Sequence, residues 1–375
     1  MNRPGEVGSS GGAGTSSGKA APDAAGSADN RSAAPRTYPL AGQRAWLITD
    51  GKAGHEAQAA GLAEALGVVA EWHRVAPTGL AKWMAPWGPA DASFAPSAPW
   101  PAIAIGIGRT AMPALRKVRR CAGLATFTVA LQDPRTTGRI ADLIWVPEHD
   151  RRRGSNVVST LTPPNRFTPA LLAALRSASD SRIDDLSGPR VMLALGGTSK
   201  AWRWTSGDID KLVAALCVLG QGGVSFLATA SRRTPPALTS AVTAALRPFP
   251  HVVYAGEGDN PYPRFLAKAD AVVVTADSVS MTGEACATGR PVFVFRPSGG
   301  SAKFERFHDA LSAAGATVPL TAATAPDLLA HLGKPWQALQ AAGAIARVIE
   351  ERWMNRARYL GPLMGQEDGP RGGDG

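Results

Sequence analysis

The feature that most limits the fold is an alternation of short β-branched runs with Ala- and Leu-rich stretches, which starts near Arg44 and occurs twice. In the first half, strands are predicted at 45–49, 103–107, 126–131 and 143–146, and helices at 56–66, 110–120 and 169–175. In the second half, strands at 190–195, 224–229, 252–254, 271–275 and 292–295 alternate with helices at 207–219, 235–246, 262–268 and 280–288. Strands that alternate with helices form parallel sheets covered on both faces, so we predict an α/β protein with two doubly wound units.

Breaks in the alternation divide the chain. Residues 1–38 are rich in Gly, Ser, Ala and Pro and lack hydrophobic periodicity, so we expect a disordered lead. The predicted parts after it are an N-terminal Rossmann-like domain at 39–175, a linker at 176–189, a C-terminal Rossmann-like nucleotide-binding domain at 190–335, a helix at 336–362 and a disordered tail at 363–375. The helix spaces apolar residues along one side, and we expect that side to pack back on the N-terminal domain.

Composition narrows the class of protein. The chain has 375 residues, of which 45% are hydrophobic and 19% charged, as in soluble globular proteins. No uncharged apolar run reaches the length that crosses a bilayer. The three cysteines lack metal-ligand spacing, so they are interpreted as core residues in a reducing compartment, and we expect a cytoplasmic protein.

The net charge of +10 includes basic clusters at 116–120, 151–153 and 232–233. One interpretation is that these are solvated faces, and the other is that they attract the phosphates of a nucleotide or of anionic lipid heads. No nucleic-acid-binding signature accompanies the charge. The final helix could itself lie on a membrane.

The first chemically informative loop follows the strand at 45–49. Asp50, Gly51, Lys52, Gly54 and His55 lie between this strand and a helix. Glycines allow backbone amides to approach a diphosphate or an acceptor, and a histidine at a helix start suits proton transfer near neutral pH. An ordinary tight turn with an incidental histidine is the alternative.

The second loop, Gly196-Gly197-Thr198-Ser199-Lys200, follows the first strand of the second half. Its amides, together with the side chains of Thr198 and Lys200, suit an oxyanion or a diphosphate.

The third loop leads from the strand at 271–275 into the next helix. Ser278 and Ser280 can cap the helix, whose N-terminus favours negative charge, and Glu284 one turn later can accept both hydroxyls of a ribose. The alternative is a capped helix with a solvent-facing acid.

A rival nucleotide motif, G-x-G-x-x-A, occupies residues 106–111, with Asp133 at a spacing that suits a ribose-binding acid. It would indicate a nicotinamide site. Since it does not follow the first strand of its unit, we favour the other loops.

Several segments together resemble the mitochondrial-fission Elm-type family, from about residue 44 to 320. They are TDGKAGHEAQAAGLAEALG (49–67), LQDPR (131–135), LIWVPEHD (143–150), LALGGTSKAWRW (193–204), TASRRTP (229–235), NPYPRFLAKADAVVVTADSVSMTGEACATGRPVFVF (260–295) and KFERFH (303–308). A more distant similarity is to GT-B glycosyltransferases, especially the peptidoglycan lipid-intermediate N-acetylglucosaminyltransferase. The loops at 51–55 and 196–198 and the segment at 269–291 carry it, with Glu284 in the place of the ribose-binding acid.

The resemblance implies a GT-B-like fold with two Rossmann-like domains facing across a cleft. It also implies transfer of a sugar from a nucleoside diphosphate donor without a metal ion, with His55 or Asp50 as the base. The expected nucleotide- and diphosphate-binding residues are Gly196, Gly197, Thr198, Lys200, Arg232, Asp277, Ser278, Ser280, Met281 and Glu284. The expected partners are therefore a nucleotide-sugar ligand and either an anionic membrane surface or a protein, and no cofactor beyond the donor is expected. The alternatives are a non-catalytic adaptor on the same fold and, less favoured, a nucleotide-sugar epimerase.

Overall fold

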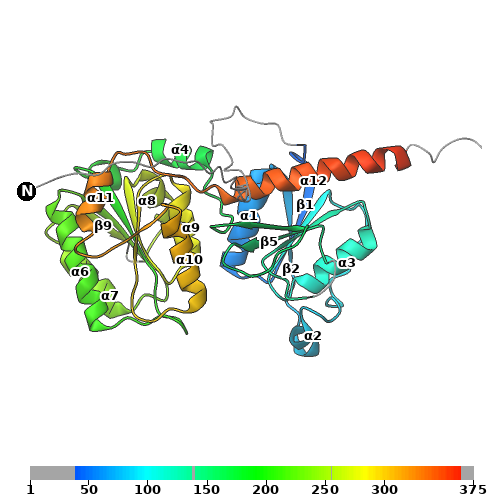
Figure 1. Ribbon diagram of the computed structural model, residues 1–375, viewed down its shortest axis with the longest axis horizontal. Coiled ribbons are helices and arrows are strands. Elements are labelled where there is room, and N and C mark those ends of the chain that lie inside the picture. Colours follow the sequence, from blue (N-terminus) through cyan, green and yellow to red (C-terminus); the bar gives the residue numbers. More distant parts are fainter. Residues whose placement is uncertain (1–38, 137–139, 255, 365–375) are drawn as a thin grey trace, which may run out of the picture. The chain divides into compact units, whose positions relative to one another are not determined.

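The computed structural model describes residues 39–136, 140–254 and 256–364, with side chains described as far as Arg356 (Figure 1). The lead expected at 1–38 lies outside the described residues, as does the tail beyond 364.

The first half forms a six-stranded sheet in the order β2-β1-β3-β4-β5-β6, with every pair parallel. The strands are β1 (Arg44–Thr49), β2 (Val69–Arg74), β3 (Ile103–Ile107), β4 (Phe127–Leu131), β5 (Leu143–Pro147) and β6 (Val157–Thr160). The helices between them are α1 (Ala53–Leu66), α2 (Gly79–Met84) and α3 (Met112–Ala122). The central strands are buried on both faces, which explains their continuous apolar sequences.

The second half forms another six-stranded parallel sheet, in the order β12-β11-β10-β7-β8-β9. The strands are β7 (Arg190–Leu195), β8 (Ser225–Ala230), β9 (His251–Tyr254), β10 (Ala271–Thr275), β11 (Val292–Phe295) and β12 (Val318–Pro319). The helices are α6 (Ser206–Gln221), α7 (Pro236–Leu246), α8 (Tyr262–Lys268), α9 (Val279–Ala287), α10 (Ala302–Ala313) and α11 (Ala325–His331). This is the strand order of a Rossmann fold.

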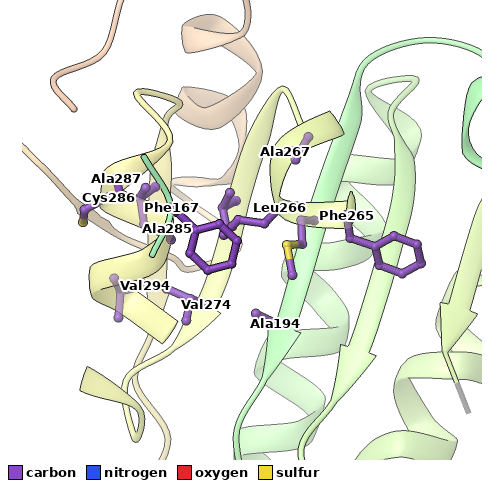
Figure 2. Packing of buried hydrophobic residues seen from close by; sticks show 14 of the residues in the cluster. Phe167, Ala194, Phe265, Leu266, Ala267, Val274, Ala285, Cys286, Ala287 and Val294 are labelled. Atoms are coloured by element: carbon purple, nitrogen blue, oxygen red, sulfur yellow. The ribbon is translucent and has the colours of Figure 1, made fainter. Parts of the chain in front are cut away.

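Each sheet is covered on both faces. In the first sheet, alternate residues of β1 pack on α1, and the others pack on α3. In the second sheet, one core lies under α6, α7 and α11, and the other lies under α8, α9 and α10. Figure 2 shows part of the latter core, with Phe167 among side chains of α8, α9 and β10. The predicted α/β class with two doubly wound parallel sheets is confirmed.

The segment between the sheets contains α4 (Pro169–Ser177) and α5 (Ser181–Asp184). The sequence assigned the first of these helices to the N-terminal domain and the second to a linker. In the structure, Phe167, Leu172 and Ile183 are buried in the core that also contains β10, and α4 packs on α8. An apolar residue every few positions is enough to attach this polar segment to the second sheet.

Two helix glycines contact residues 163–166, the crossing segment that leads from β6 of the first sheet to α4. A Cβ on Gly61 of α1 would lie 2.3 Å from the backbone carbon of Asn165, and one on Gly283 of α9 would lie 2.9 Å from Pro163. Asn165 also donates to the carbonyl of Gly283, at 3.4 Å. The absence of a side chain at both positions lets the crossing segment approach each helix closely.

The last helix, α12 (Ala341–Met364), packs on α1. Ile345 and Ile349 on its predicted apolar side are fully buried in the core of the first sheet. That side is therefore occupied by protein and is not free to lie on a membrane. Among the described residues, no helix is both long and apolar enough to span a bilayer.

The cysteines differ from the expectation that all three are core residues. Cys286 is buried, and burial raises the pKa of its thiol to about 12. Cys121, however, is exposed. It is near the end of α3, on the side that faces away from the sheet.

Candidate functional site

The predicted loops lie where the strand order reverses in each sheet. In the first sheet β1 lies beside both β2 and β3, so the loops after β1 and β3 are neighbours. In the second sheet β7 lies between β8 and β10, so the loops after β7 and β10 are neighbours. In open α/β sheets, ligands bind at the carboxyl ends of the strands at this reversal point.

In the first loop, the structure brings Asp50 and His55 together. Oδ1 of Asp50 lies 2.7 Å from Nδ1 of His55, and Lys52 donates to Oδ2 at 2.6 Å. Burial opposes ionisation of Asp50, but these two hydrogen bonds outweigh it and lower the pKa of the carboxyl group. A carboxylate on Nδ1 favours the tautomer whose Nε2 is a proton acceptor, as a general base requires.

The glycines of this loop shape it. Gly51 has φ of +78°, which lets the chain turn out of β1, and Lys52 is the N-cap residue of α1. Gly54 has open space where a Cβ would stand.

The rival G-x-G-x-x-A motif has a different use. Gly108, which follows β3, has φ of +93°, and a Cβ there would lie 2.7 Å from Cγ of Asp50 and 3.0 Å from Nδ1 of His55. Asp133 pairs with Arg152 at 2.9 Å. The glycine thus makes room for the Asp50–His55 pair, and the acid holds a neighbouring loop.

In the second sheet, the Gly196–Gly197 loop is fastened to the end of β10. Gly196 N donates to Oγ1 of Thr275 at 2.7 Å, and Gly197 N donates to Oδ2 of Asp277 at 2.8 Å. Oγ1 of Thr275 donates to the other carboxylate oxygen of Asp277 at 2.6 Å. The backbone N–H groups of both glycines therefore donate to partners within the protein and are not available to a ligand.

Asp277 is the centre of this network. Its side chain has no exposed surface, and burial raises the pKa of its carboxyl group. Arg233 approaches it to 3.9 Å. Because the carboxylate is enclosed by its own partners, Asp277 positions the two loops and does not face the solvent in which a ligand would arrive.

The other predicted binding residues near this loop, Thr198 and Lys200 within it and Arg232 after β8, divide into two groups. Thr198 donates its backbone N–H to the carbonyl of Arg233 at 3.2 Å. A Cβ on Gly197 would lie 2.0 Å from that same carbonyl, so only glycine fits. Lys200 and Arg232 are exposed. Their charges are available to an anion, whereas the backbone N–H groups of residues 196–199 are not.

The third loop starts α9. Oγ of Ser278 accepts a hydrogen bond from N of Met281 at 3.2 Å and caps the helix. One turn later, Oε2 of Glu284 accepts a hydrogen bond from the hydroxyl of Tyr262 at 2.7 Å. Burial raises the pKa of Glu284 to about 7, although the Tyr262 bond and the charge of Arg166 oppose the rise. Glu284 is therefore held by a partner in α8 and does not point freely into solvent.

A cavity of about 840 Å³ opens at the carboxyl ends of β7, β8 and β9. Its lining includes Leu195, Arg232, Tyr254, Tyr262 and Met281. The structure thus brings two predicted residues, Arg232 and Met281, to one cavity, and the partner of Glu284 borders it. The volume falls within the range of small-molecule sites.

Ser280 faces a second cavity, of about 390 Å³, which also contacts Gln58 of α1 and His149 after β5. His149 packs edge-on against Phe307 with ring centroids 5.4 Å apart. Burial and the charge of Lys303 lower the pKa of His149 to about 4, so the ring is neutral at pH 7. The N-terminus of α9 therefore lies between a larger cavity over the second sheet and a smaller one that includes residues of the first.

Two tyrosines were not among the predicted site residues. Tyr262 fixes Glu284, and Tyr254 lines the larger cavity. Tyr262 belongs to the segment NPYPRF, but a single aromatic residue at a helix start carries no sequence signal for a contact 22 positions away.

The raised pKa of Glu284 predicts a pH-dependent stability. The pKa of Glu284 is about 7 in the folded state, compared with its ordinary value of 4.5, so the folded protein binds this proton more tightly than the unfolded chain does. The folded protein therefore loses stability as pH rises through this interval. Glu284→Gln, which imitates the protonated acid, should be more stable than the wild type at pH 8 by about 2 kcal/mol and equal to it at pH 4.5. Urea unfolding at the two pH values measures this, and an equal difference at both would contradict it.

A family model described as Mitochondrial fission ELM1 matches residues 53–353. Mitochondrial fission protein ELM1 of Arabidopsis thaliana is 32% identical over 219 residues, which cover 52% of this chain and 51% of that protein. An uncharacterised protein of Rickettsia prowazekii is 32% identical over 112 residues, or 28% of this chain and 30% of that protein. The chain spans about half of the first relative's length and less than a third of the second's.

Among solved structures, UDP-GlcNAc 2-epimerase from Neisseria meningitidis, bound to UDP-GlcNAc, is 12% identical with a TM-score of 0.50, covering 83% of this chain and all of that one (100%). MurG of Acinetobacter baumannii is 14% identical with a TM-score of 0.46, covering 82% and 99%. At these identities the likeness concerns the fold. The two six-stranded parallel sheets form the GT-B-like two-domain α/β fold that the sequence predicts.

Proposed function

Because the chain belongs to the Mitochondrial fission ELM1 family and has a GT-B-like fold, we propose that it binds a nucleoside diphosphate sugar at its second sheet and transfers the sugar to an acceptor. The observation that carries the proposal is the cavity of about 840 Å³ at the ends of β7, β8 and β9, beside the reversal point of the strand order. It is large enough for a nucleoside and is bordered by two tyrosines and a cation.

In this proposal the nucleoside occupies the larger cavity and Glu284 binds the ribose. Tyr262 occupies Oε2 of Glu284 and leaves Oε1 to accept a ribose hydroxyl. The diphosphate lies toward the N-terminus of α9, where the helix dipole and Arg232 stabilise its negative charge. Such stabilisation of the leaving group makes a metal ion unnecessary.

The Asp50–His55 pair supplies the base. Nε2 of His55 takes the proton of an acceptor hydroxyl, whose oxygen forms a bond to the anomeric carbon of the sugar. The bond between that carbon and the diphosphate oxygen breaks, and the nucleoside diphosphate leaves with the electron pair. Asp50, at 2.7 Å from Nδ1, stabilises the imidazolium that forms.

Glu284→Ala is expected to weaken nucleoside diphosphate binding at least about tenfold, because the ribose hydroxyl bound by Oε1 loses its acceptor. Titration calorimetry with the purified full chain measures this directly, after a thermal-shift screen has identified the base that raises the melting temperature. Tyr262→Phe should weaken binding less, since the carboxylate remains. The control is Glu351→Ala, which removes an exposed acid on α12. Equal affinity of wild type and Glu284→Ala would remove Glu284 from the site.

One observation favours a second candidate, an adaptor that has kept the fold without turnover. The backbone N–H groups of Gly196, Gly197, Thr198 and Ser199 all donate to partners within the protein, so these four residues offer a ligand no backbone N–H. If no nucleoside diphosphate or nucleotide sugar shifts the melting temperature at millimolar concentration, we would adopt the adaptor. If a nucleotide sugar binds, product analysis separates transfer, which releases nucleoside diphosphate, from epimerisation, which leaves the nucleotide sugar intact.

A further inference from the structure

The helix α2 has a composition unlike the other helices of the first sheet. None of its residues is buried, and it presents large apolar side chains to solvent. Leu80 is 69% exposed, Trp83 is 77% exposed, and Trp87 in the next turn is 65% exposed. Leu80 and Trp83 are three positions apart, so they lie on one side of the helix. Isolated exposed apolar residues are ordinary, but three large ones within eight positions are not.

The structure holds these side chains in place and does not leave them on a loose loop. Arg109, after β3, donates to the carbonyls of Ala85 and Lys82, both at 2.9 Å. Arg116 of α3 donates to the carbonyl of Trp87, also at 2.9 Å. These guanidinium groups satisfy the carbonyls at the end of α2 and attach it to α3, its neighbour in Figure 1.

The surroundings are strongly basic. Residues 79–120 contain six Lys and Arg, at 82, 109, 116, 117, 119 and 120, and a single acid, Asp91. A cavity of about 480 Å³ beside α2 is lined by Arg116, Lys117, Arg119 and Arg120 together with two prolines and an alanine, and by no acid. Arg119 pairs with Asp142. Lys82 and Arg120 are exposed, so their charges reach beyond the protein surface.

From this combination we infer that the α2–α3 face, defined as Leu80, Lys82, Trp83, Trp87 and the basic cavity of α3, docks on a bilayer that contains anionic lipids. Tryptophan has an apolar ring and one N–H donor, which suits the boundary between acyl chains and headgroups. Lys and Arg beside it attract the headgroup phosphates. A bilayer needs no complementary shape, so a short helix that projects exposed apolar side chains can dock on it directly.

The test is co-sedimentation of the full chain with vesicles of phosphatidylcholine alone and with about one third phosphatidylglycerol. We expect pelleting with the anionic vesicles, little with the neutral ones, and a decrease as NaCl is raised. Trp83→Ser/Trp87→Ser should lower the partition coefficient at least about tenfold. Lys82→Gln/Arg120→Gln should lower it about fivefold per charge. Brominated acyl chains should quench the tryptophan fluorescence of the wild type more than that of the double serine variant.

The matched control is Lys211→Gln/Arg247→Gln, which removes the same charge from an exposed position on α6 and from the exposed C-cap of α7, and should bind vesicles as the wild type does. Since the exposed tryptophans support no core, Trp83→Ser/Trp87→Ser should keep the wild-type melting temperature. If it does not, Lys82→Gln/Arg120→Gln tests the same face. The inference would be overturned if the protein pelleted with neither kind of vesicle. It would also be overturned if Trp83→Ser/Trp87→Ser and Lys82→Gln/Arg120→Gln both bound vesicles as well as the wild type does. Glu284→Ala should leave vesicle binding unchanged, so the proposed membrane surface and the proposed nucleotide site are tested independently of each other.

Discussion

Gly61→Ala should destabilise the protein by about 3 kcal/mol, even though alanine is the better helix former. A Cβ at this position would stand 2.3 Å from the backbone carbon of Asn165, 2.5 Å from its oxygen and 2.6 Å from N of Arg166. These are main-chain atoms of the segment that crosses between the sheets, so the contact cannot be relieved by the rotation of a side chain. Either α1 or the crossing segment must move, with loss of the packing around it.

The same helix provides the control. Gly54 also lies in α1, but a Cβ there would meet nothing within 4 Å. Gly54→Ala should therefore leave stability unchanged or raise it by about 0.5 kcal/mol. Chemical unfolding of the two variants separates helix propensity from close packing. If both changed stability in the same direction and by similar amounts, the crossing segment would not be in contact with α1 as described.

Asp277→Ala should cost a similar amount, about 3 kcal/mol, and weaken nucleotide binding at the proposed site more than tenfold. The carboxylate accepts from Gly197 N at 2.8 Å and from Thr275 Oγ1 at 2.6 Å. Its removal leaves these donors in a buried place without water to replace the partner. The loop after β7 then loses its attachment to the end of β10, and the edge of the cavity loses its shape.

Asp277→Asn tests whether the loss of stability comes from the hydrogen bonds that the carboxylate accepts. The amide retains one oxygen acceptor but turns an NH₂ group toward the second donor, so we expect an intermediate loss of stability, about 1 to 2 kcal/mol. Asp210→Ala, at an exposed position on α6, is the control and should change stability by less than about 0.5 kcal/mol. Equal stability of Asp277→Ala and this control, from urea unfolding curves, would show that the network does not hold the loop.

The central strands of both sheets were predictable because burial on both faces demands continuous apolar runs, as in β3 and β10. The strands that the sequence did not predict, β2, β6 and β12, all lie at sheet edges. In β2 the side chains are mostly exposed, so its sequence, VAEWHR, lacks the apolar pattern that marks a buried strand. An edge strand forms largely through hydrogen bonds to the backbone of the neighbouring strand, and the sequence of the edge strand does not show which strand that neighbour is.

The location of the candidate site was predictable for a similar reason. Loops after parallel strands end at the same edge of a sheet, so Asp50 with His55, and Gly196 with Asp277, were expected to lie there. Their contacts were not predictable. Whether the amide of Gly197 faces a ligand or a buried carboxylate depends on a few ångströms of packing between β7 and β10, two strands about 80 positions apart in the sequence. Tyr262 was missed for the same reason, since its partner Glu284 lies on another helix.

The attachment of the Gly196–Gly197 loop to Asp277 has a consequence for the entropy of binding. A flexible loop loses about 1 to 2 kcal/mol per residue when it is ordered, and a ligand that orders it loses that much affinity. Here the internal hydrogen bonds order the residues from Gly196 to Thr198 during folding. A ligand at this edge of the sheet therefore meets a loop that is already ordered, and its affinity is not lowered by the cost of ordering residues 196–198.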